Sequence, residues 1–289
     1  MPSLKDIKRR IKSVKNTQQI TKAMKMVSAA KLKRAQDEIV AARPYAEKML
    51  GLIASLASKT SPDSHPLLAS TGGNKVAVLL YTSDRGLCGG FNTQLLRITE
   101  RFLREHSGSE LSLYLIGKRG TEYFKRRGIK TLKARAIGSG RPNYSSAVEI
   151  ANDVISAYLK GELDEVHIIY SRFQSALTQI PVSQRLLPIS TPKAAETKEE
   201  ADQGEFLFEP TEGAVLASLL PKYVEVQAFR ALLETSASEH GARMTAMDSA
   251  SKNAAEMIGA LTLKYNRLRQ AAITKELMEI IGGAEALKG

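Results

Sequence analysis

The chain is short of cysteine and of long apolar runs, and each shortage excludes a class of protein. Cys88 is the only cysteine in 289 residues, which excludes an internal disulfide and fits a reducing compartment. No apolar run is long enough to span a bilayer, so we expect no transmembrane segment. The start of the chain, MPSLKDIKRR, lacks the apolar core and cleavage site of a secretory signal.

Conventional catalytic patterns are also missing. The four histidines are scattered without metal-ligand spacing, and no pair of carboxylates stands out for acid–base chemistry. Cys88 could be a thiolate favoured by a following helix start, but no histidine lies near it in sequence to activate it. We therefore interpret Cys88 as a small buried residue, and we expect no catalytic, cofactor-binding or metal-binding residues.

Proline and glycine are scarce at the N-terminal end. Between Ser3 and Leu56 only Pro44 and Gly51 occur, and apolar residues recur at three-and-four spacing. This pattern predicts a helix of roughly 80 Å at about 1.5 Å per residue. The apolar stripe comprises Leu4, Ile7, Ile11, Val14, Met24, Val27, Ile39, Ala42, Ala46, Met49, Ile53 and Leu56.

The C-terminal segment repeats this pattern after Pro221, with Lys264 interrupting the seam. The spacing is typical of left-handed coiled coils. Because burying a large apolar side chain is worth about 1.5–3 kcal/mol, we expect the two terminal helices to bury each other. One helix enters the middle of the chain and the other leaves it, so they should be antiparallel. The seam comprises Met247, Ala250, Ala254, Met257, Leu261, Leu268 and Ala272.

The second helix is the longer one. At about 1.5 Å per residue, the second helix should draw level with Met1 at about residue 270 and then continue alone for roughly 30 Å. This end has no apolar partner left in the chain, so we expect it to enter a socket on another protein. Its apolar residues are Ile273, Leu277, Ile280, Ile281 and Leu287.

The middle of the chain alternates short apolar strands with helices, which predicts a mostly parallel sheet covered on both faces. The fold class is α/β: a long antiparallel coiled coil of N- and C-terminal helices plus a Rossmann-like α/β domain inserted between them. We expect an N-terminal shaft helix over 1–60, the α/β domain over 74–190, a linker over 191–211 and a C-terminal shaft helix over 212–289. Expected strands are 75–82, 111–117, 131–137, 165–170 and 180–188; expected helices are 92–105 with Asn92 as its cap, 121–127 and 144–160.

A glycine-rich turn, Gly86-Leu87-Cys88-Gly89-Gly90, lies between a predicted strand and a predicted helix, where dinucleotide-binding turns lie. Its spacing is G-x-x-G-G rather than G-x-G-x-x-G, and the next strand ends in Gly117-Lys118 rather than in an acid. A tight structural turn is therefore favoured over a nucleotide site.

The net charge is +12, and most of the excess lies on the first helix. Through Arg34 there are eleven basic residues against one acid, Asp6. Such a helix could bind nucleic acid, an anionic membrane or an acidic protein cavity, or simply be solvated. The absence of aromatic residues before Tyr45 removes the stacking platforms of single-strand binders and weakens the nucleic-acid interpretation.

Four segments together resemble the gamma subunit of F-type ATP synthases. They occur in the right order and span the chain: Asn16–Met26 (NTQQITKAMKM), Arg43-Pro44-Tyr45, Ser83–Asn92 (SDRGLCGGFN) and Tyr265–Ile281 (YNRLRQAAITKELMEII). The resemblance implies a non-catalytic rotor shaft, one copy per complex, that couples proton flow through the c ring to ATP synthesis on alpha and beta subunits. The α/β domain would be a foot on the c ring and epsilon subunit, without nucleotide. A bacterial protein, peripheral on the cytoplasmic face of the inner membrane, is implied.

The resemblance also implies roles for individual residues. Met24 would pass the beta-subunit lever, with Arg243 on the opposing helix near that level, and a positive charge at position 24 would impair coupling. Phe208 and Glu209 would belong to the foot that meets the c ring. Simple coiled-coil packing is the alternative for Met24 and for the apolar end. Contacts with the alpha and beta subunits would come from Arg269, Gln270, Thr274, Glu276 and Ile280.

Two other functions stay open on the residues alone. A basic coiled-coil protein that acts on nucleic acid is the first, and an enzyme that uses the Gly86 turn is the second.

Overall fold

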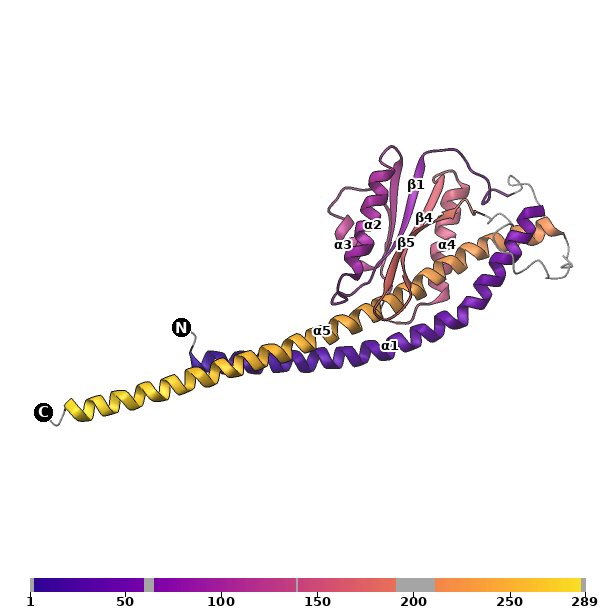
Figure 1. The fold of residues 1–289 in the computed structure, drawn as a ribbon. Helices are drawn as coiled ribbons and strands as arrows, with labels where there is room; N and C mark the ends of the chain where they lie inside the picture. The colour runs from indigo at the N-terminus through magenta and orange to yellow at the C-terminus, as the bar shows by residue number, and fades with distance from the viewer. Residues whose placement is uncertain (1–2, 60–64, 139, 191–210, 287–289) are drawn as a thin grey trace. The chain divides into compact units, whose positions relative to one another are not determined.

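The computed structural model describes residues 3–59, 65–138, 140–190 and 211–286, in two compact units (Figure 1). The helical-pair unit comprises residues 1–28 and 244–289, and the sheet unit comprises residues 29–243. Two long helices, α1 (Leu4–Lys59) and α5 (Glu212–Ala286), contribute residues to both units. Residues 191–210 of the expected linker, with Phe208 and Glu209, lie outside the described residues, as does Leu287.

The sheet unit is built on five strands in the order β3-β2-β1-β4-β5. The first four pair in parallel, and β5 pairs antiparallel with β4. The mostly parallel sheet expected from the sequence is therefore confirmed. The strands are β1 (Lys75–Tyr81), β2 (Glu110–Ile116), β3 (Thr131–Arg135), β4 (Glu165–Phe173) and β5 (Gln179–Leu187).

The central strand, β1, is buried on both faces of the sheet. Successive side chains of a strand point to opposite faces, so its apolar residues divide between two cores. Ala77, Leu79 and Tyr81 join one core, and Val76, Val78 and Leu80 join the other. A strand buried on both faces is a continuous apolar run, which is why KVAVLLY is easily recognised in the sequence.

Helices cover both faces of this sheet (Figure 1). Helix α4 (Tyr144–Leu159) packs on one face together with the parts of α1 and α5 that belong to the sheet unit. Helices α2 (Phe91–Glu105) and α3 (Lys118–Phe124) pack on the other. The first core includes Leu56, Ile150, Val154, Leu220 and Val224, and the second includes Leu95, Phe102 and Phe124.

The starts of two helices differ from the sequence-based expectation. Gly90 is the N-cap of α2, so the prediction that Asn92 caps this helix is wrong. The Asn92 side chain instead accepts a hydrogen bond from the Ser83 backbone N–H at 3.0 Å. Helix α3 begins at Lys118, earlier than the expected residue 121. The Lys118 backbone N–H donates to Asp84 at 2.9 Å, a long-range contact that local sequence does not reveal.

The core of the sheet unit can be tested with two matched substitutions. Leu115→Ala empties a site that is 1% exposed and should lower the free energy of unfolding by about 2–5 kcal/mol, because a cavity remains. Leu177→Ala, at a side chain that is 79% exposed, should change it by less than about 0.5 kcal/mol. Urea unfolding of both variants measures the difference. Equal effects would contradict the assigned core.

Candidate functional site

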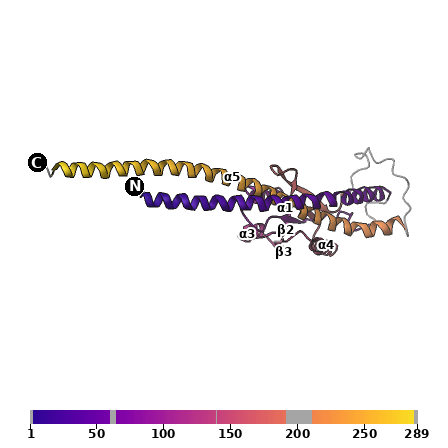
Figure 2. The same ribbon diagram turned by 90° about the horizontal axis from the view of Figure 1, so that it is seen from below.

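In the helical-pair unit, α1 and α5 lie side by side and α5 extends beyond the N-terminal end of α1 (Figures 1 and 2). Between residues 251 and 284, the α5 side chains that are not exposed recur strictly at three-and-four spacing. This period of 3.5 residues is that of a left-handed coiled coil. These seam residues of α5 are Ser251, Ala254, Ile258, Leu261, Tyr265, Leu268 and Ala272. On α1, side chains that are not exposed recur at the same spacing: Leu4, Ile7, Ile11, Val14, Gln18, Thr21, Lys25 and Ser28.

The prediction that Val27 and Met257 lie in the buried seam is wrong. Val27 and Met257 are 58% and 53% exposed, and their neighbours Ser28 and Ile258 occupy the seam. The prediction followed apolar residues alone, whereas the seam keeps its three-and-four spacing through small polar residues. Counting seven residues on from Thr21 leads to Ser28, so a strict heptad count would have found this position.

Polar groups form one layer of the seam. The hydroxyls of Thr21 and Ser251, each 7% exposed, form a hydrogen bond of 2.7 Å. One turn along, Lys25 Nζ contacts Asp248 Oδ1 at 2.6 Å, and this hydrogen bond holds the pKa of Asp248 below its ordinary value. A polar pair buried in a coiled coil favours the register in which both members are satisfied. The layer therefore sets the alignment of α1 against α5.

The polar layer can be tested with a double-mutant cycle. Thr21→Val leaves the Ser251 hydroxyl buried without this partner and should cost about 1–3 kcal/mol of local stability. Adding Ser251→Ala removes the orphaned group, so the double variant should be more stable than the sum of the two single changes predicts. Hydrogen exchange of backbone amides in residues 14–28 measures this.

Thr17→Val is the control, because the Thr17 hydroxyl is exposed and donates to the Ser13 carbonyl of its own helix at 3.1 Å. If Thr17→Val and Thr21→Val lower the protection of these backbone amides against hydrogen exchange equally, the polar layer does not stabilise the helix pair specifically.

The end of α5 has no partner in the described chain. Ala272 is the last half-buried residue, and every described side chain from Ile273 to Ala284 is exposed. This agrees with the expectation that α5 passes the first helix near residue 270. We call residues 273–286 the tip. Its apolar residues include Ile273 (52% exposed), Leu277 (52%), Ile280 (72%) and Ile281 (51%), which recur along one side of the helix.

The residues expected to contact alpha and beta subunits fall into two groups. Arg269, Gln270, Thr274, Glu276 and Ile280 are all exposed, on the last paired turn of α5 and on the tip. Met24 is half-buried on α1. These residues form a series along the helices rather than a cluster around one point.

Arg243 is placed differently. Its side chain is 9% exposed and belongs to the sheet unit, where its guanidinium donates to the carbonyls of Gly86 at 3.2 Å and Arg85 at 3.4 Å. It also pairs with Glu239 at 2.6 Å. Arg243 therefore fastens the Gly86 turn to α5. Burial, with Arg243 close by, lowers the pKa of His240 to about 4, so His240 is neutral at pH 7.

The Gly86 turn is held by the chain's own side chains. Leu87 and Gly89 have φ of 62° and 57°, the left-handed conformation that a tight turn requires. The Asp84 carboxylate accepts from the backbone N–H groups of Lys118 at 2.9 Å and Gly138 at 2.7 Å. These two N–H groups lie after β2 and β3, so the Asp84 carboxylate joins the loops after three neighbouring strands. The left-handed residues fit the tight structural turn that the sequence favours.

Cys88 is 2% exposed, which confirms that it is a small buried residue. Its Sγ accepts a hydrogen bond from Asn92 at 3.3 Å, and burial raises the pKa of the thiol. Among the described residues, no group of three or more His, Cys, Asp or Glu could hold a metal ion. None of the described helices has an apolar stretch that could cross a membrane.

Cys88 gives a chemical test of the closed turn. Because its raised pKa and its burial both suppress the thiolate, iodoacetamide at pH 8 should alkylate the folded chain at least about tenfold more slowly than the urea-unfolded chain. Arg243→Met removes the donors that hold Gly86 and should speed alkylation of the folded chain. Alkylation of the native chain at the unfolded rate would show that the turn is open.

Comparisons with known proteins match this chain over nearly its whole length. A family model described as ATP synthase matches residues 3–287. The ATP synthase gamma chain of Geotalea uraniireducens is 53% identical over 291 residues and that of Moorella thermoacetica 49% identical over 288, with 100% of each chain covered.

Solved structures give the same fold. A chain of the Euglena gracilis mitochondrial ATP synthase superposes with a TM-score of 0.72 at 21% identity, covering 98% of this chain and 94% of that one. A chain from the central stalk and c-ring structure of the Tetrahymena thermophila mitochondrial ATP synthase gives 0.60 at 25% identity, covering 80% and 99%. The fold class expected from the sequence is confirmed.

Proposed function

The chain belongs to the family of ATP synthase gamma chains, and from this membership we propose that it is the central rotor shaft of an F-type ATP synthase. The observation that carries the proposal is identity of 53% over the full length of a gamma chain. The shaft couples proton flow through the c ring to ATP synthesis and hydrolysis on the alpha and beta subunits. The chain itself is not the catalyst.

A stiff, asymmetric shaft suits this coupling. One charge that crosses about 100 mV yields roughly 2.3 kcal/mol, which is too little for one ATP, so several ion steps must be combined mechanically. A turning shaft presents different side chains to otherwise equivalent catalytic sites. Each site then responds to the difference in contact free energy between its conformations. The seam and its polar layer support the proposal, because they resist slippage of α1 against α5.

The proposed contacts with the alpha and beta subunits lie on the exposed parts of α5. The apolar tip supplies Ile280, and the polar residues around it are Arg269, Gln270, Thr274 and Glu276. Met24 on α1 is proposed to face a beta subunit as the shaft turns. Arg243 on α5 is also proposed as a contact residue, and its guanidinium donates at the same time to the Gly86 carbonyl.

The sheet unit is proposed as the foot that meets the c ring and the epsilon subunit, with Phe208 and Glu209 as contact residues. The complex contains one copy of this chain. We place it at the cytoplasmic face of the bacterial inner membrane, as a peripheral subunit, on the basis of its bacterial relatives.

The tip provides the decisive test. Ile273→Ser, Leu277→Ser and Ile281→Ser combined remove the apolar side of the tip, where each buried side chain would be worth about 1.5–3 kcal/mol in a socket. Reconstituted with alpha and beta subunits, this variant should co-purify less well and lower ATP hydrolysis several-fold. The measurements are subunit stoichiometry and turnover.

Lys275→Ser with Glu279→Ser is the matched control, because it removes an exposed ion pair from the same turns without removing large apolar residues. It should leave assembly unchanged. If the apolar and control variants behave alike, the tip is not seated in a socket. Failure of the chain to co-purify with alpha and beta subunits, together with binding to one DNA sequence at moderate salt, would overturn the rotor function.

A further inference from the structure

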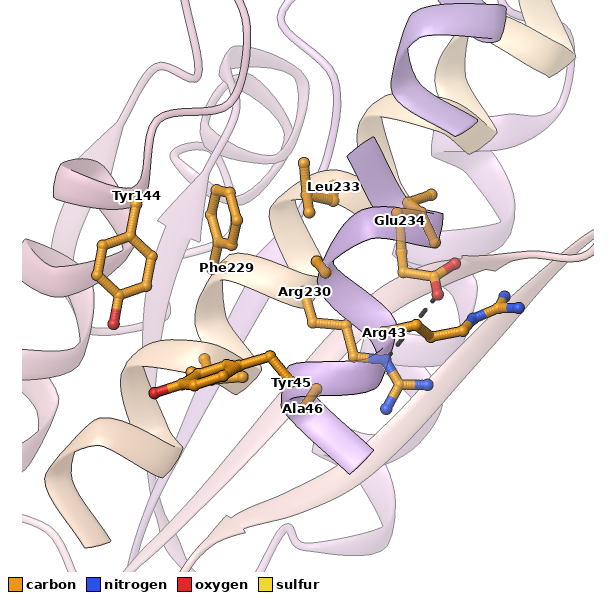
Figure 3. A pocket seen from close by; sticks show the side chains of 11 residues that line it. Arg43, Tyr45, Ala46, Tyr144, Phe229, Arg230, Leu233 and Glu234 are labelled. Atoms are coloured by element: carbon orange, nitrogen blue, oxygen red, sulfur yellow. Dashed lines mark ion pairs between the residues drawn. The ribbon is translucent and has the colours of Figure 1, made fainter. Parts of the chain in front are cut away.

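The sheet unit contains a pocket of about 400 Å³ between α1, the start of α4 and α5 (Figure 3). A volume of about 300–1,000 Å³ is usual for small-molecule sites in proteins. All residues of the pocket belong to the sheet unit. They are Ile39, Ala42, Arg43, Tyr45, Ala46, Tyr144, Val226, Phe229, Arg230, Leu233 and Glu234.

One side of the pocket is aromatic. The rings of Tyr144 and Phe229 meet edge to face, with centroids 5.4 Å apart and an interplanar angle of 83°. The Tyr144 hydroxyl donates to Glu225 at 2.8 Å, which satisfies its polar end and leaves the ring as apolar wall. Tyr45, from α1, lies near these rings in Figure 3 and is 58% exposed. Three rings from three helices thus offer a surface on which a flat or acyl group can pack.

The other side carries an excess of positive charge. Arg43 and Arg230 come from different helices, and in Figure 3 they lie on the side away from Tyr144. Glu234 is the acid among the lining residues; its side chain is 1% exposed, 3.9 Å from Arg230 Nε, and accepts from the Phe173 backbone N–H at 2.6 Å. Arg43 is exposed and forms no ion pair with an acid among the described residues. Two guanidinium groups therefore face one carboxylate that is already hydrogen-bonded.

We propose that this pocket binds a small amphipathic carboxylate, with its apolar group against Tyr45, Tyr144 and Phe229 and its carboxylate on Arg43 and Arg230. A guanidinium suits a carboxylate because it donates two parallel hydrogen bonds. The ligand would touch α1, α4 and α5 at once and hold these three helices of the sheet unit together. None of the lining residues is among those proposed above as partner contacts, so the proposal does not rest on the rotor function.

Binding can be measured with two probes of one shape. 2-Naphthoate carries the carboxylate, and 2-naphthamide presents the same rings without charge. Titrated calorimetrically into the full chain, naphthoate should bind one equivalent, at least about fivefold more tightly than the amide, because charge-assisted hydrogen bonds are stronger than neutral ones. Equal affinities would overturn the role of the arginines, and absence of naphthoate binding would overturn the site.

Two substitutions locate the bound probe. Ala42→Leu fills the pocket and should weaken naphthoate binding at least about tenfold, since the space for the rings is lost. Ala41→Leu makes the same change at the adjacent exposed position and should not alter binding. Arg43→Gln, at an exposed residue whose loss should not unfold the chain, should reduce the preference for naphthoate over the amide.

The alternative occupant is a side chain of a partner subunit. If the chain takes up neither probe while Ala42→Leu, and not Ala41→Leu, weakens assembly with the other subunits, the pocket is a docking point and the small-ligand proposal is wrong. If Ala42→Leu does not fold, as judged by circular dichroism, Arg43→Gln decides alone: an unchanged preference for naphthoate overturns the proposal.

Discussion

The mutual burial of two apolar seams is the interaction on which the helical-pair unit depends. Neither the first part of α1 nor the second part of α5 has a sheet or another described helix of its own unit to cover it. The seams pack at a period of 3.5 residues, and small residues such as Ala254 and Ser28 let the helices approach closely. This burial stops at the N-terminal end of α1, beyond which α5 continues alone. The apolar side chains of the tip are therefore exposed in the isolated chain, and only a partner in the complex can bury them.

The sheet unit shows how a nucleotide-type fold can serve as a structural body. Its strand order, with β1 between β2 and β4, places a glycine-rich turn at the carboxyl end of the central strand. In this chain Asp84 binds the neighbouring backbone N–H groups and Arg243 binds the turn's carbonyls. Side chains of the chain itself thus hold the loops at this edge of the sheet. The result is a rigid connection between the sheet and α5.

Most of the positive charge of the first helix is not paired within the described part of the chain. Of the eleven basic residues through Arg34, only Arg9, Lys25 and Lys33 form ion pairs with acids among the described residues. The Lys25 pair crosses to α5, whereas the other two lie along α1. The two pairs along α1 are exposed, and exposed pairs contribute little to stability. Most of the basic face is therefore not used by the fold of the described chain.

The sequence by itself determined the element types and the long terminal helices. KVAVLLY and the three-and-four stripes are local patterns, and such patterns report periodicity and burial directly. It also determined where α5 outruns α1, because helical rise converts residue number into length. The absence of a nucleotide fingerprint followed from spacing alone.

Only the tertiary structure decided which side chains of these elements meet. Thr21 and Ser251 are polar and 230 residues apart, so no apolar pattern marks them as partners in the seam. The same holds for Arg243 with Gly86, for Asp84 with Lys118, and for the rings of Tyr45, Tyr144 and Phe229 around one pocket. Each of these contacts joins distant segments by hydrogen bonding or packing, and the identity of a distant partner is not encoded in the spacing of neighbouring residues.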